Sequence, residues 1–140
     1  MRYILLLSLI FILFSCSNNH KETSTVKQKI SIFSPDSNIQ VSFKIQKGIP
    51  YYCVQFNNKQ VINWSELGLK FVNSDYTKEL SLTSSENSYH EEDWTPVWGA
   101  FNHIQNRYNL LHLTLQKENN KENKLHIYFK VYNDGIGFRY

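Results

Sequence analysis

Residues 39–46 read IQVSFKIQ, and this stretch decides the fold class. Apolar and polar side chains alternate with a period of two, which is typical of a β-strand that buries one face. Residues 34–38 (SPDSN) precede it and predict a turn, because a proline presets φ and the Asp and Asn side chains can bond their own backbone. The apolar residues 30–33 before the turn predict a neighbouring strand.

The same alternation recurs along the chain. After a second predicted turn at residues 47–50, strands are expected at 51–56, 61–62, 67–71 and, with a weaker pattern, 80–83. Two longer strands are expected at 109–115 and 125–132, with the charged, Asn-rich residues 117–124 as an exposed connection between them. After a tight turn at residues 133–135, a last strand is expected at 136–140.

Residues 84–103 show no steady period and include Pro96 and Gly99. This pattern predicts a long ordered loop. The apolar side chains that we expect to hold the loop in place are those of Trp94, Val97, Trp98 and Phe101.

The pattern as a whole predicts an all-β fold. Eight or nine strands without a convincing amphipathic helix favour antiparallel sheets packed as a β-sandwich. The last expected strand begins at Ile136 and stops at Tyr140, which leaves backbone groups that a further strand would pair. We therefore expect a sandwich that is incomplete at its C-terminus.

The first 15 residues have the composition of a secretory leader. Met1 and Arg2 give a positive start, and residues 4–14 are apolar apart from Ser8. A membrane-spanning helix would need about 20 apolar residues, so this run is too short to cross a bilayer. Residues 1–15 are therefore predicted to be a signal peptide that is removed on export.

The predicted cleavage site indicates a lipid anchor. Residues 13–16 (LFSC) resemble the lipobox of bacterial lipoproteins, in which the cysteine, here Cys16, becomes the acylated N-terminus. Residues 17–28 contain one apolar side chain, and residues 16–28 are expected to form a flexible tether, followed by the folded part at 29–140. The predicted location is the periplasmic or outer-membrane face of the cell envelope, held by lipid. The alternative is an ordinary leader with an incidental cysteine.

Charge and cysteine content argue against nucleic-acid binding and against an intramolecular disulfide. The net charge is +3 and the basic residues are scattered, so the chain lacks the basic stripe of a nucleic-acid-binding protein. If Cys16 is acylated, Cys53 is the only other cysteine and no intramolecular disulfide can form. We expect Cys53 to be a buried structural thiol.

The acidic and histidine residues do not predict a catalytic or metal site. Glu91, Glu92 and Asp93 are consecutive and point in different directions, whereas glycoside hydrolysis needs two carboxyl groups that face each other. His90 lacks a second histidine four residues later, where Trp94 stands. The remaining histidines of interest are expected to be separate or to be cross-strand neighbours on a polar face: His103, His112 and His126.

Three aromatic residues are candidate carbohydrate contacts. Trp94, Trp98 and Tyr108 have flat faces on which a sugar could stack. The alternative is that these rings pack a long loop.

Several segments together resemble the opening strands of the N-terminal domain of glycoside hydrolase family 97. They are residues 34–39 (SPDSNI), 48–54 (GIPYYCV), 67–71 (LGLKF), 94–99 (WTPVWG), 106–109 (NRYN) and 129–140 (FKVYNDGIGFRY). The resemblance implies a galactose-mutarotase-like super-sandwich that precedes a (β/α)8 barrel in a secreted α-glucosidase-like or α-galactosidase-like enzyme, with calcium near the active site. It places the catalytic carboxylates in the barrel and the calcium ligands beyond Tyr140. Ala100 departs from the family, which tends to have an acidic residue there.

The resemblance predicts a non-catalytic, carbohydrate-associated portion of an α-glycosidase. Its partner would be an α-linked oligosaccharide, bound through the catalytic domain, and this part alone would need no cofactor and would be inactive. Two alternatives remain open. One is a stand-alone, lipid-anchored carbohydrate-binding module that stacks sugars on Trp94 and Trp98, and the other is an inactive gene remnant.

Overall fold

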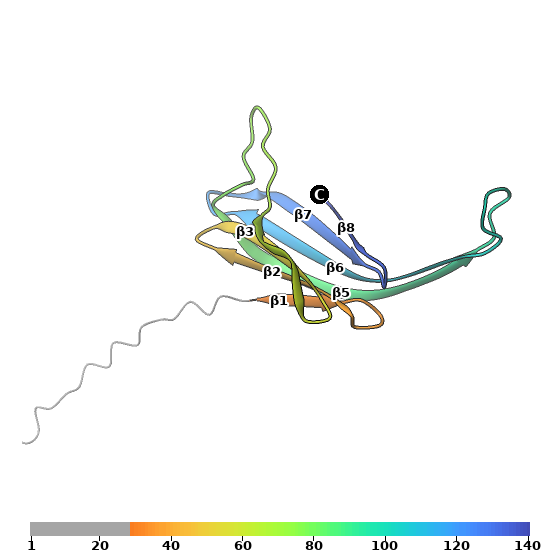
Figure 1. Ribbon diagram of the computed structural model, residues 1–140. Helices are drawn as coiled ribbons and strands as arrows, with labels where there is room; N and C mark the ends of the chain where they lie inside the picture. Colours follow the sequence, from red (N-terminus) through yellow and green to blue (C-terminus); the bar gives the residue numbers. More distant parts are fainter. Residues whose placement is uncertain (1–28) are drawn as a thin grey trace, which may run out of the picture.

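The computed structural model describes residues 29–140, and the predicted signal peptide, Cys16 and the tether lie outside this part. It contains eight strands (Figure 1): β1 (Ile30–Phe33), β2 (Ile39–Gln46), β3 (Ile49–Phe56), β4 (Lys59–Glu66), β5 (Leu80–Trp94), β6 (Ile104–Lys117), β7 (Asn120–Val131) and β8 (Ile136–Arg139). Within residues 29–140 there is no helix that could span a membrane.

The strands form two four-stranded sheets with the orders β1-β2-β3-β4 and β5-β6-β7-β8. All neighbouring strands are antiparallel. The hairpins at 47–48 and 57–58 have two-residue turns in which both residues have positive φ, from 47° to 74°. This geometry matches the right-handed twist of the flanking strands in the first sheet. In both sheets the strands follow one another in chain order, so each is a simple meander.

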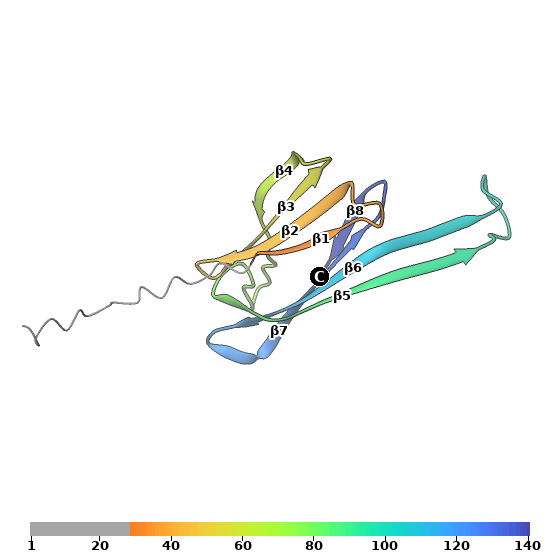
Figure 2. The ribbon, with the colours of Figure 1, turned by 90° about the horizontal axis from the view of Figure 1, so that it is seen from below.

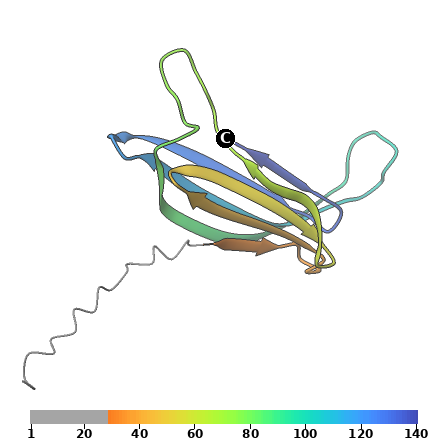
Figure 3. The ribbon, with the colours of Figure 1, turned by 60° about the vertical axis from the view of Figure 1, so that its left-hand side comes forward.

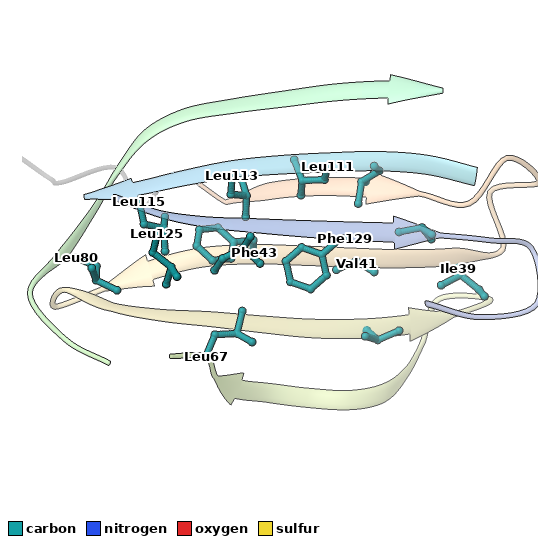
Figure 4. Packing of buried hydrophobic residues seen from close by; sticks show 14 residues of the cluster. Ile39, Val41, Phe43, Leu67, Leu80, Leu111, Leu113, Leu115, Leu125 and Phe129 are labelled. Atoms are coloured by element: carbon teal, nitrogen blue, oxygen red, sulfur yellow. The ribbon is translucent and has the colours of Figure 1, made fainter. Parts of the chain in front are cut away.

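The two sheets pack face to face, as Figures 2 and 3 show from two sides. Their inward side chains form one apolar core (Figure 4). Phe129 lies at its centre, with its ring centroid 6.0 Å from that of Tyr52 and 5.5 Å from that of Phe138. The fully buried apolar side chains are Val41, Phe43, Pro50, Leu80, Leu111, Leu113, Leu115, Ile127, Phe129 and Val131. The predicted antiparallel β-sandwich is confirmed.

The long loop predicted at residues 84–103 is wrong over its first half. Residues 84–94 belong to β5, which pairs with β6 as far as Trp94, so only residues 95–103 form a loop. The apolar side chains expected to hold that loop are exposed instead, from 45% for Trp94 to 99% for Val97. Strand pairing, rather than aromatic packing, therefore supports this segment.

Two other predicted boundaries are also wrong. Residues 67–71 form no strand and make only an isolated bridge between Lys70 and Asp75, although Leu67 is buried in the core. The connection predicted at 117–124 is in fact a two-residue turn at 118–119, because Lys117 already pairs with Asn120. Residues 120–124 belong to β7. The strand predicted at 61–62 is confirmed and extends over the whole of β4.

The second sheet has one unusual feature, a two-stranded projection that we call the arm. The pairing of β6 with β7 begins at Asn109, so from Tyr108 outward β6 pairs with β5 alone. The arm comprises residues 90–108 and extends beyond the sandwich, with its loop at the tip (Figure 2). It is the part of the described chain that carries the candidate carbohydrate contacts.

Candidate functional site

The tip of the arm presents open aromatic faces. Trp94 ends β5 and is 45% exposed, and Trp98 in the loop is 88% exposed. Phe101 and Val97 add apolar surface beside them and are also exposed. An indole ring open to solvent offers an apolar face and an N–H donor, the two features that a pyranose ring can use.

The third candidate, Tyr108, is placed differently. It is 6% exposed, and its ring is stacked at 4.9 Å and 12° on His90, the residue opposite it on β5. The ammonium group of Lys130 lies 4.3 Å from the ring centroid, and Tyr132 contacts the ring as well. Tyr108 is therefore packed at the base of the arm, apart from the open tryptophan faces.

The face of the arm that carries Arg107, which we call its inner face, forms a polar network with the adjoining Tyr89. The sequence alone did not predict this network. Arg107 forms an ion pair with Glu91 at 2.7 Å, and the Tyr89 hydroxyl donates a hydrogen bond to Glu91 at 3.0 Å. Farther out, Asp93 lies 3.9 Å from Arg107 and 3.8 Å from His103. The hydrogen bond to the Glu91 carboxylate raises the pKa of Tyr89, because it favours the protonated phenol. No local motif could have shown this network, since its members are brought together by strand register.

The acidic cluster behaves as the alternation of a strand requires. Glu91 and Asp93 face the side of Arg107, whereas Glu92 contacts Asn106 at 3.4 Å. Consecutive side chains of a strand point to opposite faces, so the three carboxylates do not converge. The predicted difference in orientation between neighbours is present, although these residues stand on a strand rather than in a loop.

The histidines also follow the prediction. His112 and His126 are cross-strand neighbours, with Nε2 and Nδ1 2.9 Å apart, and His112 stacks on Tyr128 at 4.3 Å. His90 hydrogen-bonds to Ser88 at 2.9 Å. Over residues 29–140, His, Cys, Asp and Glu nowhere form a group of three or more that could hold a metal ion. Cys53 is buried and free, as expected.

Comparison with known proteins identifies the fold. The family described as "Glycosyl-hydrolase 97 N-terminal" matches residues 32–140. A glycoside hydrolase family 97 enzyme from Pseudoalteromonas sp. strain K8, solved as complexes with panose and with acarbose, superposes with a TM-score of 0.73 at 26% identity. A β-arabinopyranosidase superposes with a TM-score of 0.72, also at 26% identity.

These matches cover much of this chain and little of its relatives. The alignment spans 78% of this chain and 17% of the Pseudoalteromonas enzyme, and 79% and 18% for the β-arabinopyranosidase. The sequence resemblance is thereby confirmed. Since the family match covers most of its length, the chain belongs to the N-terminal domain family of glycoside hydrolase family 97.

Proposed function

We propose that this chain is the non-catalytic, carbohydrate-associated sandwich of a family 97 glycoside hydrolase, and that hydrolysis takes place on a separate (β/α)8 barrel. The observation that carries the proposal is the match of residues 32–140 to the N-terminal family, while the solved enzymes are far longer than the matched part. Function resides in sites rather than folds, so the carboxylates of this chain need separate examination.

The carboxylates on the arm support a non-catalytic role. Glycoside hydrolysis needs one carboxyl group as acid and a second as nucleophile or base on opposite sides of the scissile bond. Glu91 is held by Arg107 and by the Tyr89 hydroxyl, and Asp93 lies near Arg107 and His103. Both acids are thus engaged by neighbouring side chains of the same hairpin, which supports a structural role for them.

The proposed substrate class is an α-linked oligosaccharide. Panose and acarbose are bound by the Pseudoalteromonas enzyme to which this fold is similar. The calcium ion of the proposed enzyme does not fit residues 29–140, where no group of three or more acidic, histidine or cysteine residues could hold a metal. Its ligands would be supplied by another part of the enzyme.

The proposed location is the cell envelope, with a lipid on Cys16. The support comes from the leader composition of residues 1–15 and the LFSC sequence at 13–16. Mass spectrometry of the N-terminal peptide from membranes should find acylated Cys16. In a Cys16→Ser variant the lipid should be absent, and an unmodified Cys16 in the unaltered protein would contradict the anchor.

Hydrolysis of 4-nitrophenyl α-D-glucopyranoside and α-D-galactopyranoside tests the catalytic part of the proposal. The 140-residue chain should release no nitrophenol. The product that includes any coding sequence downstream of codon 140 should hydrolyse one of the two substrates. Hydrolysis by the 140-residue chain itself would contradict a non-catalytic role, and a downstream sequence without barrel-like βα repeats would contradict the larger enzyme.

The exposure of Trp98 and Trp94 favours a second candidate, a lipid-anchored sugar-binding module that uses these rings as stacking platforms. Titration with maltooligosaccharides and α-galactosides should then change the tryptophan fluorescence of the chain. Unchanged spectra at millimolar sugar would remove this candidate.

A further inference from the structure

The open edge of the sandwich contains a groove near the base of the arm. It has a volume of about 330 Å³ and is lined by residues of both edge strands, β1 and β5. Its lining residues include Ser31 and Phe33 from β1, Asn87 and Tyr89 from β5, and Asn109 from β6. Its volume is at the lower end of the range of about 300–1,000 Å³ that is typical of small-molecule sites.

The groove combines an open aromatic ring with fixed polar groups. Tyr89 is 53% exposed, and its hydroxyl bond to Glu91 holds the ring in place. Glu91 is in turn fixed by Arg107 at 2.7 Å. The Asn109 amide donates to the Phe33 carbonyl at 2.8 Å, which ties the two walls together. A site whose groups are already oriented loses less entropy when it binds.

The charges beside Tyr89, outside the lining itself, restrict the ligand. Glu91 and Arg107 neutralise each other, and the additional carboxylate of Asp93 disfavours an anion. The amide and hydroxyl groups of the lining can donate and accept hydrogen bonds, as vicinal sugar hydroxyls require. We infer that this groove binds a neutral α-linked oligosaccharide, with one pyranose ring stacked on Tyr89 and its hydroxyls bonded to Asn87 and Ser88 of the lining.

This inference rests on the proposed function for the class of sugar, but it names a different place on the molecule from the tryptophans of the arm tip. None of the residues that line the groove is a tryptophan. Sugar bound in the groove should therefore release heat without changing tryptophan fluorescence, whereas sugar bound at Trp94 and Trp98 should change it.

The test is isothermal titration calorimetry of the full chain, purified in mild detergent, with maltotriose. Tyr89→Ala should weaken binding at least about tenfold, because it removes the stacking ring. Tyr89→Phe keeps the ring and loses only the bond to Glu91, so a smaller loss is expected. Val72→Ala, at a fully exposed side chain outside the groove lining, is the control and should bind as the unaltered chain does. Trp98→Ala separates the two places, because it should weaken binding only if the sugar lies at the arm tip.

Circular dichroism melting checks that each variant folds, and Asn87→Ala serves as the second groove variant if Tyr89→Ala does not fold. Loss of binding in Trp98→Ala with retention in the groove variants would overturn the inference, and so would the absence of heat at millimolar maltotriose. Neither outcome affects the nitrophenyl glycoside assay, so failure of the groove and failure of the proposed function are distinguishable.

Discussion

The sandwich body and the arm are built from the same antiparallel pairing and differ in what they bury. In the body, β2, β6 and β7 bury apolar side chains against the opposite sheet, and many of these side chains have no exposed surface. In the arm, residues 90–108 keep the β5–β6 hydrogen bonds, although neither face is covered by a second sheet. The difference between the two regions shows that burial of apolar side chains stabilises the sandwich, whereas strand pairing by itself lengthens a sheet without adding a core.

The largest difference in stability between body and arm is expected on truncation of Phe129. Phe129→Ala removes a fully buried ring between Tyr52 and Phe138, and should lower the free energy of unfolding by about 3–5 kcal/mol. Urea unfolding gives the value. The control is Phe101→Ala in the arm loop, 71% exposed, with an expected change within about 0.5 kcal/mol. Equal losses would show that the arm is as tightly packed as the body.

A smaller effect is expected at Gly68, beside the core. A Cβ at Gly68 would lie 2.8 Å from the Thr77 Cα and 2.9 Å from the Tyr76 carbonyl oxygen, both backbone atoms. Gly68→Ala should therefore cost about 1–3 kcal/mol in thermal or urea unfolding, as overpacking does. In the matched variant Gly135→Ala the methyl group meets open space, and the change should stay below about 1 kcal/mol. A neutral Gly68→Ala would mean that this loop does not rest on the core as described.

The ion pair on the arm should contribute less. Arg107 and Glu91 are 2.7 Å apart, but their side chains are 42% and 46% exposed, so solvent screens the attraction. A double-mutant cycle with Arg107→Ala and Glu91→Ala should give a coupling of about 0.2–1 kcal/mol that decreases with added salt. A coupling of several kcal/mol would indicate that the inner face of the arm is more enclosed than the structure shows.

The smallest effects should come from two carboxylates in body loops. The pKa of Asp36 is lowered by the Ser34 hydroxyl and then by the Asn38 backbone N–H, and that of Asp75 by the hydroxyl and N–H of Thr77. The unfolded chain, with a pKa of 3.8, binds protons first on acidification, so stability falls as the pH drops below that value. Urea midpoints measured against pH should follow this direction.

The double variant Asp36→Asn, Asp75→Asn provides the control for that pH dependence. It lacks both titrating groups, so its midpoints should change less with pH in the acidic range. An unchanged slope would assign the acid sensitivity to other carboxylates.

The body could be predicted from the sequence because its strands bury one face. Residues 39–46 alternate between apolar and polar side chains, and they form β2 with the expected boundaries. A strand that buries one face needs an apolar residue at every second position, and this period of two is visible in the sequence. Residues 67–71 have the same apolar character without forming a strand, because Leu67 packs on the core from a loop that makes only the isolated Lys70–Asp75 bridge.

The arm could not be predicted in the same way. Residues 84–94 bury almost nothing, so no hydrophobic period marks them, and their strand exists only because β6 pairs with them. Residue type marked Trp94 and Trp98 as candidate carbohydrate contacts, but it did not predict their exposure, since the same rings were also expected to hold the loop. The Tyr89–Glu91–Arg107 network depends on the register that places Arg107 opposite Glu91, which residue type and spacing do not contain.

Hydrogen–deuterium exchange on the full chain tests the central distinction between body and arm most directly. The account predicts that backbone amides of residues 110–116 and 125–131 exchange slowest, and that those of 90–94 and 104–107 exchange at least about 100-fold faster. The arm would then be a paired but uncovered extension, open for ligand contact. Equal protection in both regions would contradict the account.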